Sequence, residues 1–175
     1  MLRVELTVAY IFSQILVVLY YLIYSGTFHL KEKNKILLLG SCATILSAVS
    51  YFLLQAYTGI AMCLVAIIRN IWFSKSKSKK SLIIIYLITI LLSVFSYQNI
   101  FSILNILATI IYTYSLWQES TKKYKLLGIL VNGFMIVYDT YIKSVMGVFF
   151  MIISFISSII GYYKENSKKQ ENTIN

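Results

Sequence analysis

Positive charges recur in every second gap between the hydrophobic segments of this chain. Thirteen of its sixteen Lys and Arg residues lie in four gaps, at 29–35, 74–80, 122–125 and 164–175. The gaps at 55–59 and 96–99 are uncharged, and the gap at 139–143 holds one acid and one base. Loops rich in Lys and Arg stay on the cytoplasmic side of a membrane. The alternation therefore predicts seven spans, with the N-terminus outside and the C-terminus in the cytoplasm.

The composition agrees with a membrane protein and leaves no room for a sizeable soluble domain. Of the 175 residues, 59% are apolar and 13% are charged, whereas soluble domains have about 45–50% and about 25%. A net charge of +10 would suggest a nucleic-acid partner in a soluble chain. Here, with only two arginines, it is better explained by a basic rim facing anionic headgroups. The expected partner is the lipid bilayer, without nucleic acid, and a homo-oligomer stays open.

Seven hydrophobic stretches have about the length needed to cross a bilayer, which is near 20 residues. The expected spans are 7–25, 36–54, 58–74, 81–96, 99–117, 124–140 and 144–163. The polar segment 164–175 is expected to be a disordered cytoplasmic tail. The fold class is therefore all-α, a polytopic membrane protein with seven transmembrane helices.

Short sequence matches relate the first three spans to the last three. Gly40 and Gly128 are 88 positions apart, as are Gly59 and Gly147. Two further matches, of 11–13 with 100–102 and of 73–75 with 162–164, have an offset of 89. With the fourth span unpaired, the two triplets have the same orientation, as in transporters with parallel repeats. The predicted division is therefore a first three-helix bundle with its basic loop (1–80), a linker helix (81–98), a second bundle (99–163) and the tail (164–175).

The turns after the second and sixth spans are candidate parts of an outer mouth. In one reading, Thr58-Gly59 and Lys143-Ser144 only turn the chain and cap helices. In the other, Gln55, Tyr57, Tyr138 and Asp139 surround a cavity. Asp139 either pairs with Lys143 at i+4 or faces the bundle interior as a cation or proton site.

Four further polar residues lie inside the predicted spans. Arg69, near the cytoplasmic end of the third span, either extends to the lipid phosphates or lines an inner mouth and meets an anionic group. Gln14, Asn105 and Asn132 lie near mid-membrane, where an unpaired amide is costly. They either join helices by hydrogen bonds or contact an uncharged substrate from both halves of the chain.

Signs of catalysis and of metal binding are absent from the sequence. The one histidine, His29, lies in a predicted cytoplasmic loop, so a paired-histidine motif cannot form. Cys42 and Cys63 fall inside hydrophobic stretches without a metal-ligand spacing and are expected to be small buried residues. The sequence predicts no enzyme, no metal and no cofactor.

Two blocks of the sequence resemble the YgjV family of bacterial inner-membrane proteins. The first consists of Leu38-Leu39-Gly40, the run 50–54 and the run 66–70. The second consists of 136–139, Gly147 and 157–160. The resemblance covers most of residues 8–163 and implies a multi-pass protein of the bacterial inner membrane, without an established biochemical role.

The plan of three, one and three helices is also similar to the SWEET sugar transporters and the PnuC vitamin-precursor transporters. The chain departs from both families. It has no proline, whereas SWEET-type repeats have proline hinges, and it has only two tryptophans, Trp72 and Trp117, whereas PnuC proteins have a Trp-rich site. No site residue is carried over from either family.

The function expected from these patterns is passage of a small, mainly neutral polar solute between the two bundles by alternating access. Gln14, Asn105 and Asn132 would contact the substrate, Asp139 with Gln55 would form an outer gate or ion site, and Arg69 would form an inner gate. The alternative is a membrane component that does not transport but binds lipid or a partner protein. In that case the polar residues would be satisfied in pairs, without a cavity.

Overall fold

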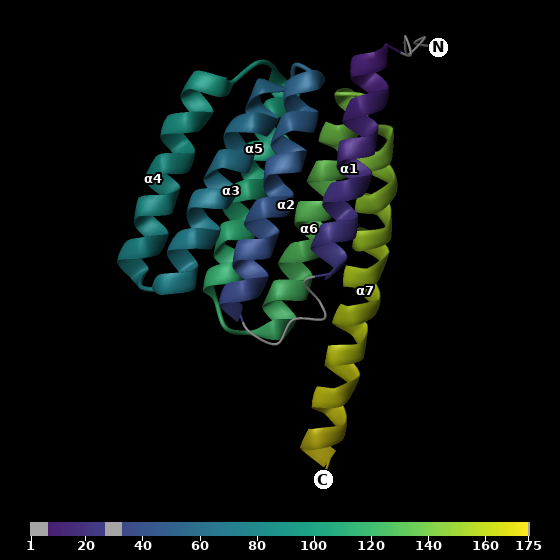
Figure 1. The fold of residues 1–175 in the computed structure, drawn as a ribbon. Helices are drawn as coiled ribbons and strands as arrows, with labels where there is room; N and C mark the ends of the chain where they lie inside the picture. The colour runs from purple at the N-terminus through teal and green to yellow at the C-terminus, as the bar shows by residue number, and fades with distance from the viewer. Residues whose placement is uncertain (1–6, 27–32, 175) are drawn as a thin grey trace.

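A computed structural model describes residues 7–26 and 33–174, and this part of the chain is entirely helical apart from turns (Figure 1). Its helices are α1 (Val8–Gly26), α2 (Lys33–Leu53), α3 (Tyr57–Lys75), α4 (Lys79–Ser96), α5 (Ile100–Trp117), α6 (Thr121–Tyr141) and α7 (Val145–Ile174). In a bilayer only a helix or a closed barrel satisfies every backbone N–H and C=O group within itself. The all-α fold predicted from the hydrophobic stretches is confirmed.

The helix bounds lie close to the predicted spans, with one exception at the C-terminus. We expected the segment 164–175 to be disordered, but α7 continues to Ile174 and extends past the other helices (Figure 1). This prediction was wrong because Lys, Glu and Gln are good helix formers and no Pro or Gly interrupts the segment. Residues 29–32 of the first basic gap, His29 and Lys31 among them, lie outside the described residues.

The helices alternate in direction, so the described connections gather at two ends of the bundle. The α3–α4 and α5–α6 connections lie at one end, which we call the basic end (Figure 1). The turns α2–α3, α4–α5 and α6–α7 lie at the opposite end. Local caps fix several starts: Ser78 accepts a hydrogen bond from Ser81 N, and Asn99 and Ser102 form a capping box at α5.

The helices pack as two triplets that meet at two helix pairs. Within each triplet the middle helix, α2 or α6, contacts both of its neighbours. The triplets meet where α3 packs against α5 and where α1 packs against α7, and α4 lies on α3 and α5. The backbones of α2 and α6 do not pack against each other, so large side chains must fill the space between them.

The distribution of side chains is inverted relative to a soluble protein. The buried set includes many polar residues, namely Ser13, Ser50, Thr58, Arg69, Asn70, Ser81, Thr89, Ser102, Asn105, Thr113 and Asp139. Large apolar side chains instead cover the outside, for example Phe95 on α4 and Phe149 on α7. Cys42 is also on the outside, against our expectation, whereas Cys63 is buried as expected. An apolar exterior of this extent requires lipid rather than water around it.

Length and composition separate the helices into two groups. Five helices of the described residues, α1, α3, α4, α5 and the part 145–163 of α7, are long and apolar enough to cross a membrane. In α2 the apolar part is the shorter stretch Leu37–Leu53. In α6 the first turns contain Lys122, Lys123 and Lys125. Each of these two helices packs against two neighbours whose apolar stretches are long enough to cross a membrane.

The turns α2–α3 and α6–α7 have the same backbone geometry at positions 88 apart. Gln55 and Lys143 have positive φ angles of 56° and 59°. Ala56 N donates to Tyr51 O at 2.9 Å, and Ser144 N donates to Asp139 O at 2.8 Å. The predicted capping role of Thr58 is not seen, since α3 has no side-chain cap. Its hydroxyl instead donates to Ser96 O at 2.6 Å and lies 2.9 Å from Ser102 Oγ, which ties α3 to the start of α5.

Each turn is followed by a glycine that a larger residue cannot replace without a shift. A Cβ at Gly59 would lie 2.7 Å from the Tyr51 ring, and a Cβ at Gly147 would lie 2.8 Å from Asp139 Oδ2. We therefore expect Gly59→Ala to destabilise the protein by about 1–3 kcal/mol through overpacking. Thermal unfolding of the detergent-purified protein measures this. Gly26→Ala is the control, because no atom of the described residues lies within 4 Å of a Cβ placed there. Equal melting temperatures for the two variants would contradict the packing described here.

Candidate functional site

Asp139 is the buried acid of the bundle, and it contacts the other triplet. Its side chain, 2% exposed, lies near the end of α6. The Tyr51 hydroxyl, from α2, donates a hydrogen bond to Asp139 Oδ1 at 3.2 Å. In the described part of the chain no ion pair joins Asp139 to Lys143, whose side chain is exposed in the turn. The carboxylate therefore faces the interior of the bundle, without a cation beside it.

Tyr138 and Asn105 extend this cluster toward α5. The rings of Tyr51 and Tyr138 meet edge to face, with centroids 6.2 Å apart. Asn105 lies beside Tyr138 and is 3% exposed. Within the described residues its Nδ2 has no hydrogen-bond partner. A buried amide donor without an acceptor is costly in protein interiors, so this position has an unsatisfied capacity to bind a polar group. We call Tyr51, Asn105, Tyr138 and Asp139 the Asp139 cluster.

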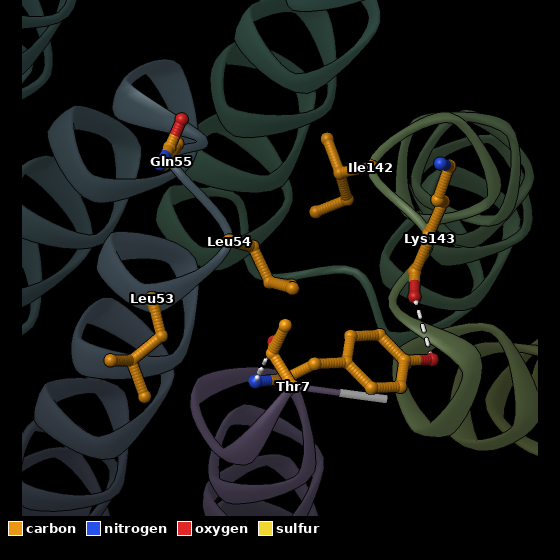
Figure 2. A pocket seen from close by; sticks show the side chains of 7 residues that line it. Thr7, Leu53, Leu54, Gln55, Ile142 and Lys143 are labelled. Carbon is orange, nitrogen blue, oxygen red and sulfur yellow. Dashed lines mark hydrogen bonds between the residues drawn. The ribbon is translucent and has the colours of Figure 1, made fainter. Parts of the chain in front are cut away.

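A cavity of about 230 Å³ lies at the end of the bundle opposite the basic end, at the turns that join α2 to α3 and α6 to α7 (Figure 2). It lies between the two turns and the start of α1, as the close view shows. It is lined by Thr7, Tyr10, Leu53, Leu54, Gln55, Ile142 and Lys143. Gln55 and Lys143, the two residues with positive φ, are both in this lining. Tyr10 donates to Lys143 O at 3.2 Å and so closes one side of the cavity.

The predicted outer gate residue Gln55 thus lies at the cavity, with its side chain exposed. Its carbonyl accepts a hydrogen bond from Gln98 Nε2 at 3.0 Å, which holds the turn against the α4–α5 connection. Tyr57, also predicted at the mouth, is 53% exposed and is not part of the cavity lining. Of the four residues predicted around the mouth, Gln55 lines the cavity, whereas Tyr138 and Asp139 are buried and do not line it.

The three mid-membrane amides occupy three different environments. Gln14 Oε1 accepts a hydrogen bond from Met146 N at 2.9 Å, so Gln14 on α1 caps the start of α7. Asn132 Nδ2 donates to Ser158 Oγ at 3.2 Å and joins α6 to α7. Asn105, in contrast, belongs to the Asp139 cluster. No hydrogen bond joins any two of these amides in the described part of the chain, and neither cavity described here is lined by them.

Arg69 lies inside the bundle, in the half nearer the basic end. Its side chain is 3% exposed, so it does not reach along the helix to the lipid phosphates. The guanidinium donates to Asn70 Oδ1 at 3.2 and 3.1 Å and to Thr113 Oγ1 at 3.5 Å, and it lies 4.8 Å above the centre of the Tyr112 ring. A second cavity, also about 230 Å³, opens at the basic end and is lined by Lys77, Ser115, Leu116, Gln118, Glu119 and Tyr124.

The sequence did not identify Tyr24, Tyr51 and Tyr112 as functional candidates, although one signal was present. Tyr51 and Asp139 are 88 positions apart, and so are Tyr24 and Tyr112, whose hydroxyls lie 3.1 Å apart. Both pairs thus join residues related by the offset of the sequence matches. Pairing each buried polar residue with the residue 88 positions away would have placed Tyr51 opposite Asp139.

The fold, the apolar exterior and the buried charged residues define a polytopic α-helical membrane protein. Residues 11–169 match the family Imp-YgjV, described as bacterial inner membrane protein. The chain therefore belongs to this family, as the resemblance in the sequence implied, and it is a protein of the bacterial inner membrane. Searches among curated proteins and among solved structures gave no match.

We expect Tyr51→Phe to destabilise the protein by about 1–3 kcal/mol, because it leaves a buried carboxylate without its donor. For a chain of this size, this lowers the melting temperature by several degrees, at about 2–4 °C per kcal/mol. Thermal unfolding in detergent measures the change. Tyr57→Phe removes a hydroxyl from an exposed tyrosine on the neighbouring helix and should leave the melting temperature nearly unchanged. If Tyr51→Phe were equally neutral, the Tyr51–Asp139 hydrogen bond would not stabilise the bundle.

Proposed function

We propose that this protein passes a small, mainly neutral polar solute through the space between its two triplets. The observation that carries the proposal is the Asp139 cluster. It contains a buried carboxylate and an amide donor without a partner among the described residues, and Asp139 lies near the end of α6, whose following turn lines a cavity. The cost of leaving such groups unsatisfied in a membrane protein is expected where they serve an ion or solute pathway. The proposal involves no catalytic step.

Alternating access would use the two triplets as the moving parts. The equal turns and the contacts between positions 88 apart support an internal repeat, in which spans one to three correspond to spans five to seven. In transporters with such repeats, the solute binds at the interface between repeats and one repeat rocks against the other. Here the interface between α2 and α6 is bridged by side chains rather than packed backbones, so a small separation would open it.

The cluster favours a solute with both hydrogen-bond acceptors and hydroxyl or amine donors. Asn105 Nδ2 would donate to the solute, and the Tyr138 hydroxyl can donate or accept. Asp139 would accept a hydrogen bond, or hold a proton or a cation, and act as the outer gate together with Gln55. Gln14 and Asn132 would contact the solute only after exchanging their present helix partners, so we give Asn105 the first place among the three amides.

The charge distribution supports the orientation of the protein in the membrane. Lys75, Lys77, Lys79 and Lys80 lie around the α3–α4 connection, and three more lysines begin α6, all at the basic end. Because cytoplasmic loops hold the excess of Lys and Arg, we propose that the basic end faces the cytoplasm. The cavity beside Gln55 then faces outward, and Arg69 belongs to the inner half.

A second candidate function is a membrane component that binds lipid or a partner protein without transport. The hydrogen bonds of Gln14 to Met146 N and of Asn132 to Ser158 favour it, since both amides are already satisfied between helices. Asn105 is the residue that this alternative does not account for, because its Nδ2 has no partner among the described residues.

A thermal-unfolding screen of the detergent-purified protein against sugars, nucleosides, vitamin precursors and amino acids tests the solute site. A solute at 100 times its dissociation constant adds about 2.7 kcal/mol of apparent stability. We expect a saturable shift that Asn105→Ala removes by leaving the solute without its donor. Asn132→Ala is the matched control. If both variants lose the shift, the site extends to α7. If Asn132→Ala alone loses the shift, the proposed position of the site is wrong. No shift, together with a co-purified lipid or protein, would favour the alternative function.

Uptake into proteoliposomes tests the role of Asp139 separately from binding. We expect uptake of a solute found by the screen to respond to an imposed pH gradient in the wild type. Asp139→Asn keeps the size of the side chain but can neither lose a proton nor attract a cation, so uptake should continue at most passively and without dependence on the gradient. Wild type and Asp139→Asn are compared at the same imposed pH gradient. Unchanged gradient dependence in Asp139→Asn would exclude this carboxylate as the coupling site.

A further inference from the structure

Arg69 is a buried cation whose surroundings contain no acid in the described part of the chain. It contacts an amide, a hydroxyl and an aromatic ring, from Asn70, Thr113 and Tyr112. A guanidinium has five N–H donors, and three hydrogen bonds account for three of them. A charge removed from water is costly unless it is paired and fully hydrogen-bonded. The remaining donors and the uncompensated charge indicate a place for an anion.

A chain of three tyrosines begins at this guanidinium. The Tyr112 ring lies beneath it, and the Tyr24 and Tyr112 hydroxyls are 3.1 Å apart. The Tyr124 ring follows, with its centroid 6.5 Å from that of Tyr112. The three tyrosines come from α1, α5 and α6, so the cluster joins both triplets. Phenolic hydroxyls beside a guanidinium supply the neutral and charged donors that an oxyanion needs.

The cavity at the basic end lies on the Tyr124 side of this cluster. Tyr124 lines the cavity, and its ring is tilted against that of Tyr112, over which Arg69 lies. The Tyr124 side chain is partly exposed, at 38%, and a change of its rotamer would connect the cavity and Arg69. Lys77 and Glu119, one of each charge, are also in the cavity lining. The strong positive charge of this end as a whole attracts anions toward it.

We propose that Arg69, with the hydroxyls of Tyr24, Tyr112 and Tyr124, forms a binding site for a single oxyanion, a carboxylate or a phosphate, that is reached from the basic end. The planar guanidinium binds two oxygens of such a group side by side. The hydroxyls of the tyrosines donate to the remaining oxygens once the Tyr24–Tyr112 hydrogen bond is given up. This site is separate from the Asp139 cluster and does not depend on transport of a neutral solute.

Binding of simple oxyanions to the full-length protein tests the site. The protein in a neutral detergent is titrated with sodium phosphate, sulfate and acetate against sodium chloride at equal ionic strength, and thermal unfolding is followed. A parallel series uses nanodiscs of phosphatidylcholine with and without phosphatidylglycerol. Saturable stabilisation by a soluble anion identifies a free oxyanion as the ligand, and stabilisation by phosphatidylglycerol alone identifies a lipid headgroup. Either result supports the site if Arg69→Gln weakens the binding at least tenfold.

Two further variants separate binding from folding and from general charge. Tyr112→Phe keeps the ring beneath Arg69 but removes one hydroxyl, so we expect about tenfold weaker binding in a folded protein, as for loss of one hydrogen bond to a charged group. If Arg69→Gln does not fold, Tyr112→Phe is the variant that tests the anion site. Lys75→Gln removes an exposed charge from the end of the same helix and should leave binding unchanged. The proposal is overturned if no anion or lipid stabilises the wild type saturably, or if Lys75→Gln weakens binding as much as Arg69→Gln or Tyr112→Phe.

Discussion

The hydrocarbon of the bilayer offers no hydrogen-bond partner, and the rest of the structure depends on this constraint. Helices satisfy the backbone, and the hydroxyls of Thr44, Thr89 and Thr113 are satisfied by carbonyls one turn earlier in their own helices. Charged and amide side chains cannot be satisfied in this way. They must turn inward, which explains why Arg69, Asn105 and Asp139 are buried while Phe and Ile residues cover the outside.

The two buried charges of opposite sign do not neutralise each other. Gly59 on α3 lies against Tyr51, next to Asp139, and Arg69 follows ten residues later on the same helix. At 1.5 Å per residue these positions are about 15 Å apart. Each charge therefore sits among tyrosines in its own half of the bundle, and each half has a cavity at its end. In the orientation that we propose, the outer half would suit a cation or proton, and the inner half an anion.

The proposed repeat gives the two triplets a common backbone and different side chains. The turns at Gln55 and Lys143 have matching φ angles, and each is followed four residues later by a glycine in close contact with the preceding helix. At the equivalent positions before the turns, however, one helix has Tyr51 and the other has Asp139. A repeated backbone thus places a donor opposite an acceptor at the boundary between the triplets. A symmetric pair of carboxylates there would repel each other.

The sequence by itself determined the class of the protein and the course of the chain. Hydrophobic stretches of the right length and alternating lysines predicted the helices and their ends within a few residues, because each signal is local. The helical continuation of α7 was missed because a polar composition suggests disorder as readily as an exposed helix. Asp139 and Arg69 were recognised as candidates, since a charged residue in a span is conspicuous.

Only the tertiary structure decided which polar residues meet. A helix that is apolar on nearly all sides gives little indication of which face turns inward. The sequence therefore could not distinguish Asn105, which lies in the Asp139 cluster, from Gln14 and Asn132, which join helices to α7. For the same reason it did not show that Tyr51 reaches Asp139, or that Tyr24, Tyr112 and Tyr124 surround Arg69. These contacts depend on the rotation of each helix about its own axis, and that rotation is set by packing between helices distant in sequence.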